Sequence, residues 1–381
     1  MLRFLHCADA HLDTPYTVAD LDAADLKRAE LRAAFSSMLL YIRQNDIRLV
    51  LIAGDLFSHA FIKKETISFL WREMEQTPSC HFVITPGNHD FYTDDCVYAQ
   101  SSLPSNVHVF TSEKVRSVYF EDIGAEVWGF AHVAPQMPGY RPLAGVRPVE
   151  KKPGVFRIFC GHADIRGTSE DTPQITKEQL ARFGFDYAAL GHIHNTEGVR
   201  RVGKTYFGYS GCLIGRDFSE TGFKGAICGI LRTDENGANN VSVRRLRVAR
   251  RHYEVLTVDL TALRLAQTLT EADVIAHILR TAEDAHITLD RDTALSLTLT
   301  GEIPADLFFE ETQLLASLPD IASLTLIDRT VPWQAEALSE DPTLRGAYYN
   351  ELRDALFSED ETLRQTAAIA LRVGLQELKN R

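Results

Sequence analysis

The segment Leu2–Asp13, LRFLHCADAHLD, begins as a short apolar run and ends in a carboxylate and an imidazole two residues apart. The run predicts a buried strand at Arg3–Ala8, because charged and polar residues interrupt it and it is too short for a signal peptide or a membrane span. Asp9 and His11 then lie in the loop at the carboxyl end of that strand. Such a triplet is common by chance, so its weight depends on what the rest of the chain repeats.

Four more short apolar segments, each predicted to be a strand, end in side chains that can bind metals. These segments and the residues after them are Leu49–Ala53 with Asp55, His81–Thr85 with Asn88, His89 and Asp90, Phe156–Cys160 with His162, and Tyr187–Leu190 with His192 and His194. A lone buried histidine is usually a core residue. Here five of the 13 histidines follow apolar strands together with acidic partners, which favours a shared site.

Helical patterns separate the first strands. Leu31, Phe35, Met38 and Ile42 repeat on one helix face, and a second helical pattern covers Lys63–Glu75. Alternation of strands and helices indicates an α/β layered fold, in which the loops after the strands carry the chemistry.

From about residue 205 the pattern changes to strands without helices between them. We interpret these strands as a second sheet that completes a catalytic domain of residues 1–250. They are Lys204–Tyr209, Gly225–Arg232 and Ser242–Val248, with a hairpin turn at Asp234–Gly237. The predicted fold class is therefore α/β, a layered sandwich of two mixed β-sheets flanked by helices.

Two smaller parts are predicted after this domain. Residues 253–330 form a small α/β module, with strands at Glu254–Leu260, Thr293–Thr300 and Ala322–Asp328 and helices at Glu271–Ala285 and Ala305–Ser317. Residues 335–381 form a helical hairpin, with helices at Thr343–Phe357 and Thr362–Asn380. Such a hairpin either packs on its own domain or binds a helix of another protein.

Composition limits the classes of function. The 381 residues are 45% hydrophobic and 24% charged, as in globular proteins, and six scattered cysteines without a C-x-x-C pair indicate reduced thiols in a cytoplasm. The net charge of −12 argues against a general nucleic-acid binder, so any DNA contact has to be local. The densest basic run, 244–251, is explained equally well as a solvated strand edge.

The residues at the strand ends predict a site for two divalent cations. Cations about 3.5 to 4 Å apart need a bridging carboxylate, and Asp55 is the candidate bridge. Carboxylates, one amide and imidazoles suit Mn, Fe, Zn or Mg, and the lack of cysteine ligands disfavours a structural zinc site. The predicted ligands, with His89 beside them, are Asp9, His11, Asp55, Asn88, His162, His192 and His194.

The motifs D-x-H, G-D, G-N-H-D, G-H and G-H-x-H follow one another between residues 9 and 194, and this order resembles the calcineurin-like metallophosphoesterases. The stretches HCADAHLD at 6–13 and GDLF at 54–57 are similar to the SbcD group of DNA repair exonucleases and its YhaO-like branch. Members of that group carry a capping domain and terminal helices that bind an SbcC-like coiled-coil ATPase. The resemblance assigns these parts to residues 253–330 and 335–381.

The resemblance also implies a role for each site residue. One metal, most often Mn²⁺ in this group, would be held by Asp9, His11, Asp55 and His194, and the other by Asp55, Asn88, His162 and His192. A hydroxide activated by both cations would attack phosphorus, while His89 acts on the transition state or the leaving oxygen. A homodimer would form through helical segments such as Lys63–Glu75 and Tyr92–Ser101.

One position departs from the family pattern. Three residues after the bridging aspartate, where the family often has Asp or His in support of the catalytic histidine, this chain has Ser58. We expect His59 or Asp90 to orient His89 instead, or phosphodiester cleavage to be slow. An exposed loop histidine without a role explains His59 equally well.

A Gly-rich loop at Tyr209–Phe218 follows a predicted strand, and in this family such a loop borders the substrate cleft. Arg216 is a candidate for binding a substrate phosphate, and His59 is a second candidate for substrate contact. A salt bridge of Arg216 with Asp217 or Glu220 is an equal alternative.

The leading interpretation is a manganese-dependent nuclease that acts on DNA ends with a coiled-coil ATPase. Metal chemistry alone does not select the ester, so a phosphodiesterase or phosphatase for a small nucleotide is the first alternative. The acidic net charge favours it slightly. The second alternative is a catalytically weak regulatory subunit of an ATPase complex, to which only Ser58 lends weight.

Overall fold

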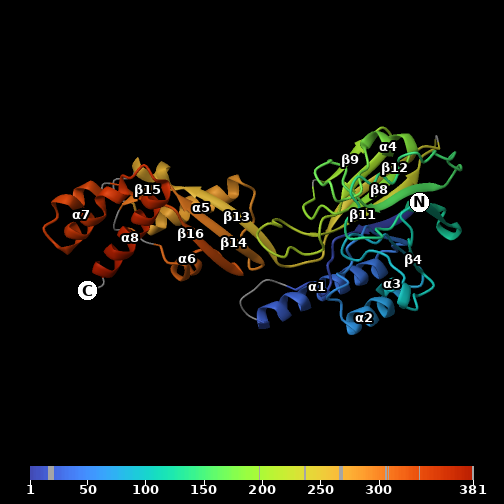
Figure 1. The fold of residues 1–381 in the computed structure, drawn as a ribbon, viewed down its shortest axis with the longest axis horizontal. Coiled ribbons are helices and arrows are strands. Elements are labelled where there is room, and N and C mark those ends of the chain that lie inside the picture. Colours follow the sequence, from blue (N-terminus) through green and yellow to red (C-terminus); the bar gives the residue numbers. More distant parts are fainter. Residues whose placement is uncertain are drawn as a thin grey trace. The chain divides into compact units, whose positions relative to one another are not determined.

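The computed structural model describes residues 1–15, 21–196, 198–235, 237–265, 269–304, 307, 309–333 and 335–379. The chain divides into two compact units (Figure 1). The first comprises residues 1–216 and 223–250, and the second comprises residues 217–222 and 251–381. Each unit is considered by itself. In the described part of the chain, no helix is long and apolar enough to cross a membrane.

The first sheet of the first unit has the strand order β12-β11-β1-β2-β3-β4. Its four strands β1 to β4 run parallel, and β11 and β12 add an antiparallel hairpin at one side. The bounds are β1 Leu2–Cys7, β2 Leu49–Ile52, β3 His81–Ile84, β4 Val107–Val109, β11 Gly225–Thr233 and β12 Asn239–Arg247.

The second sheet has the order β5-β6-β7-β8-β10-β9. Its central strands β6, β7, β8 and β10 are parallel, and its edge strands β5 and β9 are antiparallel. The bounds are β5 Arg116–Phe120, β6 Ala125–Gly129, β7 Phe156–His162, β8 Tyr187–Gly191, β9 Val199–Val202 and β10 Thr205–Tyr209. The fold class predicted from the sequence, a sandwich of two mixed sheets, is therefore confirmed.

The expectation that the strands after residue 205 form the second sheet by themselves is wrong. β10 joins β8 in the sheet that β7 and β8 already occupy. The hairpin of β11 and β12 returns to the first sheet, where Leu2 of β1 pairs with Leu231 of β11. The apolar β11 residues are buried beside β1, which explains this long-range pairing. Of the predicted hairpin turn, Asn236 lies outside the described residues.

Three apolar layers hold the first unit together, and one of them packs α4 (Lys177–Phe183) against the outer face of the second sheet. The inner layer, with Phe4, Leu51, Ile158 and Tyr187, lies between the two sheets. The third layer packs α1 (Leu21–Gln44) and α2 (Lys64–Glu75) against the other face of the first sheet. The helix face predicted from Leu31, Phe35, Met38 and Ile42 is fully buried there.

The remaining helices of this unit are short, namely α3 Val97–Gln100, α4 Lys177–Phe183 and the 3-10 turn η1 Glu121–Ile123. Of the segment Tyr92–Ser101, only the single turn α3 is helical. That segment therefore presents much less helix to a second copy than the sequence predicted, and the homodimer stays a prediction.

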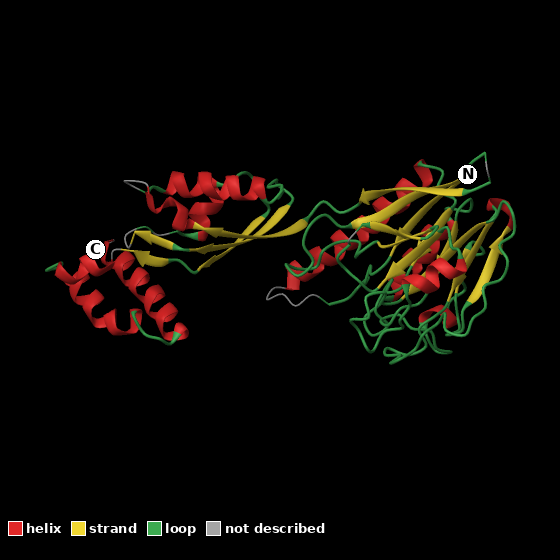
Figure 2. Cartoon of the chain, turned by 90° about the horizontal axis from the view of Figure 1, so that it is seen from above, coloured by secondary structure: helices red, strands yellow, loops and turns green. Residues whose placement is uncertain are grey.

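The second unit contains a parallel sheet of β13 (His252–Asp259), β14 (Thr293–Thr300) and β16 (Ser323–Asp328). Figure 2 shows helices on one face of this sheet, where α5 (Glu271–Asp284) and α6 (Glu311–Ser317) pack on its apolar side chains. The other elements are η2 Leu260–Leu265, β15 Glu302–Pro304, β17 Val331–Trp333, η3 Ala335–Glu340, α7 Leu344–Leu356 and α8 Glu361–Lys379. Residues 305, 306 and 308 of the predicted helix Ala305–Ser317 lie outside the described residues, as does Asn380.

The terminal helices pack on their own unit. α7 and α8 share a small core of Tyr349, Leu371 and Leu375. The buried guanidinium of Arg372 on α8 bonds to Asp328 and Thr330 at the end of the small sheet. The helices are thus fixed to the α/β module, and whether they also bind a partner helix stays a prediction, as does the boundary proposed between residues 330 and 335.

Candidate metal centre

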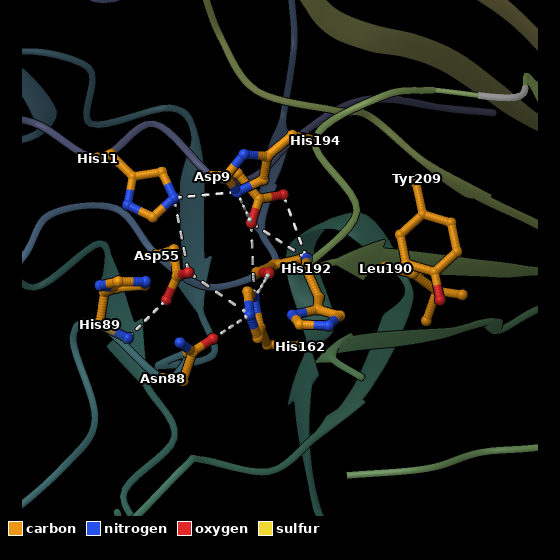
Figure 3. A network of polar contacts seen from close by, with 12 residues as sticks. Asp9, His11, Asp55, Asn88, His89, His162, Leu190, His192, His194 and Tyr209 are labelled. Atoms are coloured by element: carbon orange, nitrogen blue, oxygen red, sulfur yellow. Dashed lines mark hydrogen bonds and ion pairs between the residues drawn. The ribbon is translucent and has the colours of Figure 1, made fainter. Parts of the chain in front are cut away.

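The strand-end residues predicted from the sequence come together in the first unit (Figure 3). They follow β1, β2 and β3 of the first sheet and lie at or after the ends of β7 and β8 of the second. Asp9, Asp55 and His162 are buried, with 1%, 2% and 0% of their surface exposed. The side chains point toward one another, so the two sheets build one cluster between them.

Asp9, His11 and His194 form the first group of the cluster, with candidate ligand atoms all within 4.8 Å of one another. The Nε2 atoms of His11 and His194 are 3.2 Å apart, and His194 Nε2 lies 3.8 Å from an Asp9 oxygen. The main-chain nitrogen of His192 donates to both Asp9 oxygens at 3.1 and 3.2 Å, which fixes that carboxylate.

Asp55 lies between this group and the next one. Its Oδ2 is 3.7 Å from His11 Nε2 and 3.6 Å from His162 Nε2. Its Oδ1 accepts a hydrogen bond of 2.8 Å from the main-chain nitrogen of His89. A carboxylate in this position can serve both groups, as the predicted bridging role requires.

His162 and Asn88 complete the second group. His162 Nδ1 donates to the carbonyl oxygen of Ala53 at 3.0 Å, so Nε2 carries the lone pair of the neutral ring. That lone pair faces Asn88 Oδ1 at 2.9 Å. With the amide in this orientation two acceptors face each other, which suits a cation beside them, and burial disfavours a proton there because it lowers the pKa of His162 well below its ordinary value.

His192 lies at the side of the cluster. Its ring centroid is 5.4 Å from that of His162, and its Nε2 is 3.4 Å from Thr172 Oγ1. Thr172 is buried and in turn accepts from the Ser169 hydroxyl at 3.0 Å. The loop at 169–172 thus contributes a polar contact to one of the predicted ligands.

Several site residues have a left-handed backbone conformation, which residues other than glycine rarely adopt. The φ angles are +50° for Asp9, +48° for His11, +53° for Asp55 and +104° for His192. Such conformations cost about 1 to 3 kcal/mol each and persist only where the surroundings enforce them. Here Asp9 N donates to Gly54 O at 3.0 Å and His11 N donates to Asp55 O at 2.9 Å, so the loops after β1 and β2 hold each other.

Burial sets the charge of the cluster. It lowers the pKa of His11 to about 3 and also lowers the pKa of His192, so both rings are neutral, the form in which histidine binds metals. Burial also raises the pKa of Asp9, and the nearby Asp55 carboxylate adds to this rise. Buried carboxylates beside neutral imidazoles are costly unless a cation compensates them. The residues present therefore fit divalent cations.

His89 is the exposed member of the cluster. Its main chain is held at both ends, because its nitrogen donates to Asp55 and its carbonyl accepts from His59 N at 3.0 Å. Its ring lies edge-on to that of His11, with centroids 4.8 Å apart. A fixed backbone with an exposed ring leaves this histidine available to a substrate.

Within the described residues, the side chains of His59 and Asp90 do not hydrogen-bond to the His89 ring, whereas the main-chain nitrogen of His59 holds the His89 carbonyl. That either residue orients His89 stays a prediction. His59 Nε2 donates to the carbonyl oxygen of Phe91 at 2.6 Å, and the His59 ring has edge contacts with the rings of Phe57 and Phe91. Ser58 Oγ lies 3.0 Å from Thr14 Oγ1. The carboxylate of Asp90 accepts hydrogen bonds from main-chain nitrogens of two loops and from the Tyr98 hydroxyl. Substrate contact by His59 stays a prediction.

Asp90 joins the loop after β2 to the loop after β3. It is fully buried, and it accepts hydrogen bonds from the main-chain nitrogens of Asp55 at 3.0 Å, Leu56 at 2.9 Å and Gly87 at 2.6 Å. It also accepts from the Tyr98 hydroxyl at 2.6 Å. The side chain therefore positions the candidate bridge Asp55 relative to Asn88 without facing the cluster.

We expect Asp90→Ala to lower the free energy of unfolding of the first unit by about 3 kcal/mol or more, because three buried N–H groups lose their acceptor. Retention of Mn²⁺ should weaken at least about 10-fold, as for other residues that support ligands. Urea denaturation and metal titration measure the two effects. Tyr98→Phe removes only one donor and should cost about 1 kcal/mol. Equal stability of the two variants would contradict this role.

Two buried histidines support the site in ways that the sequence did not reveal. His6 bridges the sheets, because its Nε2 donates to Leu190 O at 3.1 Å and its Nδ1 accepts from the Tyr187 hydroxyl at 3.0 Å. His132 Nε2 donates to the carbonyl oxygen of His162 at 2.9 Å. The available signal for His6 was a polar residue within an otherwise apolar strand.

Arg216 contacts one of the predicted metal ligands. Its guanidinium donates to His194 Nδ1 at 2.8 Å, and its positive charge lowers the pKa of Asp9, against the larger effect of burial. The side chain is half-buried at the end of the Gly-rich loop. It thus brings a fixed positive charge to the edge of the predicted metal ligands.

A sandwich of two mixed sheets with buried Asp and His side chains at the strand ends, fitted to divalent cations, defines a metallophosphoesterase. Residues 2–196 match the family of calcineurin-like phosphoesterases, and the chain belongs to that family. Its site is therefore that of a metal-dependent phosphoesterase.

Two curated relatives are similar to part of the chain. A Bacillus subtilis (strain 168) protein described as uncharacterized metallophosphoesterase YhaO is 28% identical over 235 residues, which are 59% of this chain and 56% of that protein. The DNA double-strand break repair protein Mre11 of Methanopyrus kandleri is 24% identical over 207 residues, 51% of this chain and 44% of that protein. The chain spans about half the length of these relatives.

Among solved structures, TT1561 of Thermus thermophilus covers 64% of this chain and 98% of its own, with a TM-score of 0.38 and 10% identity. The purple acid phosphatase PPD1 from yellow lupin covers 55% of this chain and 43% of its own, with a TM-score of 0.33 and 15% identity.

Proposed function

We propose that the chain is a metal-dependent DNA nuclease, a phosphodiesterase that acts on DNA ends. The observation that carries hydrolysis is the buried cluster of two carboxylates and neutral imidazoles, with His89 exposed beside it. Support for DNA as the substrate comes from the similarity to a protein named for DNA double-strand break repair. The similarity to YhaO, described as an uncharacterized metallophosphoesterase, supports the phosphoesterase class and leaves the ester open.

In this proposal Asp9, His11, Asp55 and His194 hold one cation, and Asp55, Asn88, His162 and His192 hold the other. When bound, the cations supply Lewis acidity to the phosphate and lower the pKa of water. His89 would donate a proton to the leaving oxygen as the bond from the water oxygen to phosphorus forms and the ester bond breaks, and the proton lost by the water would pass to solvent. The hydrogen bonds of its main chain to Asp55 and His59 keep the ring near the cluster.

Arg216 is proposed to bind a non-bridging phosphate oxygen, because a guanidinium forms strong charge-assisted hydrogen bonds with phosphate. We expect Arg216→Gln to raise KM for bis-p-nitrophenyl phosphate about 10-fold, while Arg216→Lys keeps the charge and loses less. Steady-state kinetics with saturating Mn²⁺ measure both variants. An unchanged KM in Arg216→Gln would contradict phosphate binding by Arg216 and leave only its hydrogen bond to His194.

The nuclease assignment is tested with Mn²⁺, bis-p-nitrophenyl phosphate and an end-labelled DNA duplex. We expect wild-type protein to degrade both substrates, and His89→Ala to slow both by at least about 100-fold, as for loss of general-acid catalysis. Cleavage of the small diester alone would contradict the DNA assignment and support the alternative of a small-nucleotide phosphodiesterase, which the net charge of −12 favours. Cleavage of neither would support the regulatory alternative.

We further propose that the terminal helices of residues 335–381 bind the coiled coil of an SbcC-like ATPase, and that residues 253–330 are a capping domain. The support is that α8 exposes apolar side chains, with Ile369 and Val373 50% and 55% exposed, although its opposite face is packed on α7. Residues 369 and 373 are four apart and share one helix face.

A further inference from the structure

A cavity of about 410 Å³ lies on the outer face of the first sheet, at the edge opposite to the metal centre. Arg3 stands at the amino end of β1, whose carboxyl end leads to Asp9, and Ile230 pairs with it on β11. The end of α1 closes one side of the cavity. The residues used below are Arg3, Tyr41, Asn45, Ile47, Ile230 and Arg244.

Two guanidinium groups line this cavity, and neither has an acidic partner within the described part of the chain. Arg3 Nη1 donates to Asn45 O at 2.9 Å, whereas its Nε is buried without a hydrogen-bond partner among the described residues. Arg244 donates to the Tyr41 hydroxyl and lies over the Tyr41 ring, 5.5 Å from the ring centroid. No described carboxylate lines the cavity either. The two positive charges of the cavity are therefore not neutralised by the described residues around them, although the chain as a whole has a net charge of −12. An anionic ligand would neutralise them.

Part of the remaining lining is aliphatic. Ile47 and Ile230 line the cavity beside the two arginines. The volume falls within the range of small-molecule sites, which combine apolar walls with a few placed polar groups. Guanidinium groups match phosphate oxygens in geometry and charge, so the polar end suits a phosphate and the wall suits an organic group.

We propose that this cavity binds a small phosphate ester of mononucleotide size, at a site separate from the metal centre. Two guanidinium groups in one cavity can neutralise a single phosphate, and the cavity volume of about 410 Å³ limits the ligand to a small molecule. The proposal does not depend on hydrolysis, because the cavity and the cluster occupy opposite edges of the sheet.

The test measures by titration calorimetry the equilibrium binding of deoxyadenosine 5′-monophosphate and of inorganic phosphate to the full chain in EDTA. We expect the nucleotide to bind at least about 10-fold tighter than phosphate, and the double variant Arg3→Gln, Arg244→Gln to lose at least about 10-fold in affinity, as for lost charge-assisted contacts. EDTA removes the metals and so prevents hydrolysis at the metal centre. The binding result therefore does not depend on whether the protein is a hydrolase.

Two further variants separate binding from folding. Ile230→Trp fills the cavity without changing charge and should also abolish nucleotide binding. Arg247→Gln is the matched control, because Arg247 lies on the same strand as Arg244 with its guanidinium 4.0 Å from the Phe223 ring centroid and outside the cavity. Equal affinity of the nucleotide and phosphate, or unchanged binding in both the double variant and Ile230→Trp, would overturn the proposal.

Discussion

Asp55→Asn should abolish metal-dependent hydrolysis, with a loss of at least about 1,000-fold in the rate on bis-p-nitrophenyl phosphate, because one charge is shared by both groups of the cluster. The amide keeps the size of the side chain and can still accept from His89 N. What it loses is the negative charge that lies 3.7 Å from His11 Nε2 and 3.6 Å from His162 Nε2. The number of Mn²⁺ ions retained per chain after desalting should fall in parallel with the rate.

Asp13→Asn is the matched control for this variant. Asp13 is also buried and also has a left-handed backbone, with φ of +62°. Its carboxylate bonds to Arg32 at 3.0 Å and to Lys63 N at 3.0 Å, outside the cluster. We expect this variant to keep its metal. Near-normal hydrolysis by Asp55→Asn would contradict the role of Asp55 as the carboxylate that bridges the two metals.

The existence of the strands could be predicted from the sequence, but their partners could not. Short apolar runs such as Leu49–Ile52 and Tyr187–Gly191 identify buried strands by composition. Pairing is decided by which apolar faces remain open, and this depends on contacts far apart in the chain. The pairing of Leu2 with Leu231 is such a contact, and nothing in the sequence around either residue indicates it.

The candidate site shows the same division between local and distant information. The spacing of motifs relative to strand ends was enough to group Asp9, Asp55 and His162, because parallel strands present their carboxyl ends together. Orientation of side chains was not predictable. Ser58 pointed to His59 as a substitute partner for His89, yet His59 is held by a carbonyl oxygen two residues after His89. That contact depends on how two loops meet.

His6 makes the first unit sensitive to acid, and we expect wild-type stability to fall steeply below pH 6.5. Burial lowers the pKa of His6 from 6.5 to about 3. Between these two pH values the His6 side chain is protonated in the unfolded chain and neutral in the folded chain. Stability is therefore complete above pH 6.5 and is lost as pH falls toward 3. The loss attributable to this residue is about 1.4 kcal/mol per pH unit, or about 3 kcal/mol at pH 4.

The contribution of His6 is isolated by comparison with His6→Gln, whose amide can also donate to Leu190 O and accept from Tyr187. Urea denaturation of both proteins in EDTA at pH 7 and pH 4 should show the variant losing about 3 kcal/mol less, while the other buried histidines contribute equally to both. Tyr187→Phe removes the hydroxyl but leaves His6 buried. It should lower stability by about 1 kcal/mol at both pH values, with the acid sensitivity retained. If His6→Gln is as acid-sensitive as the wild type, the bridge between β1 and β8 does not resist protonation, and other buried histidines account for the loss.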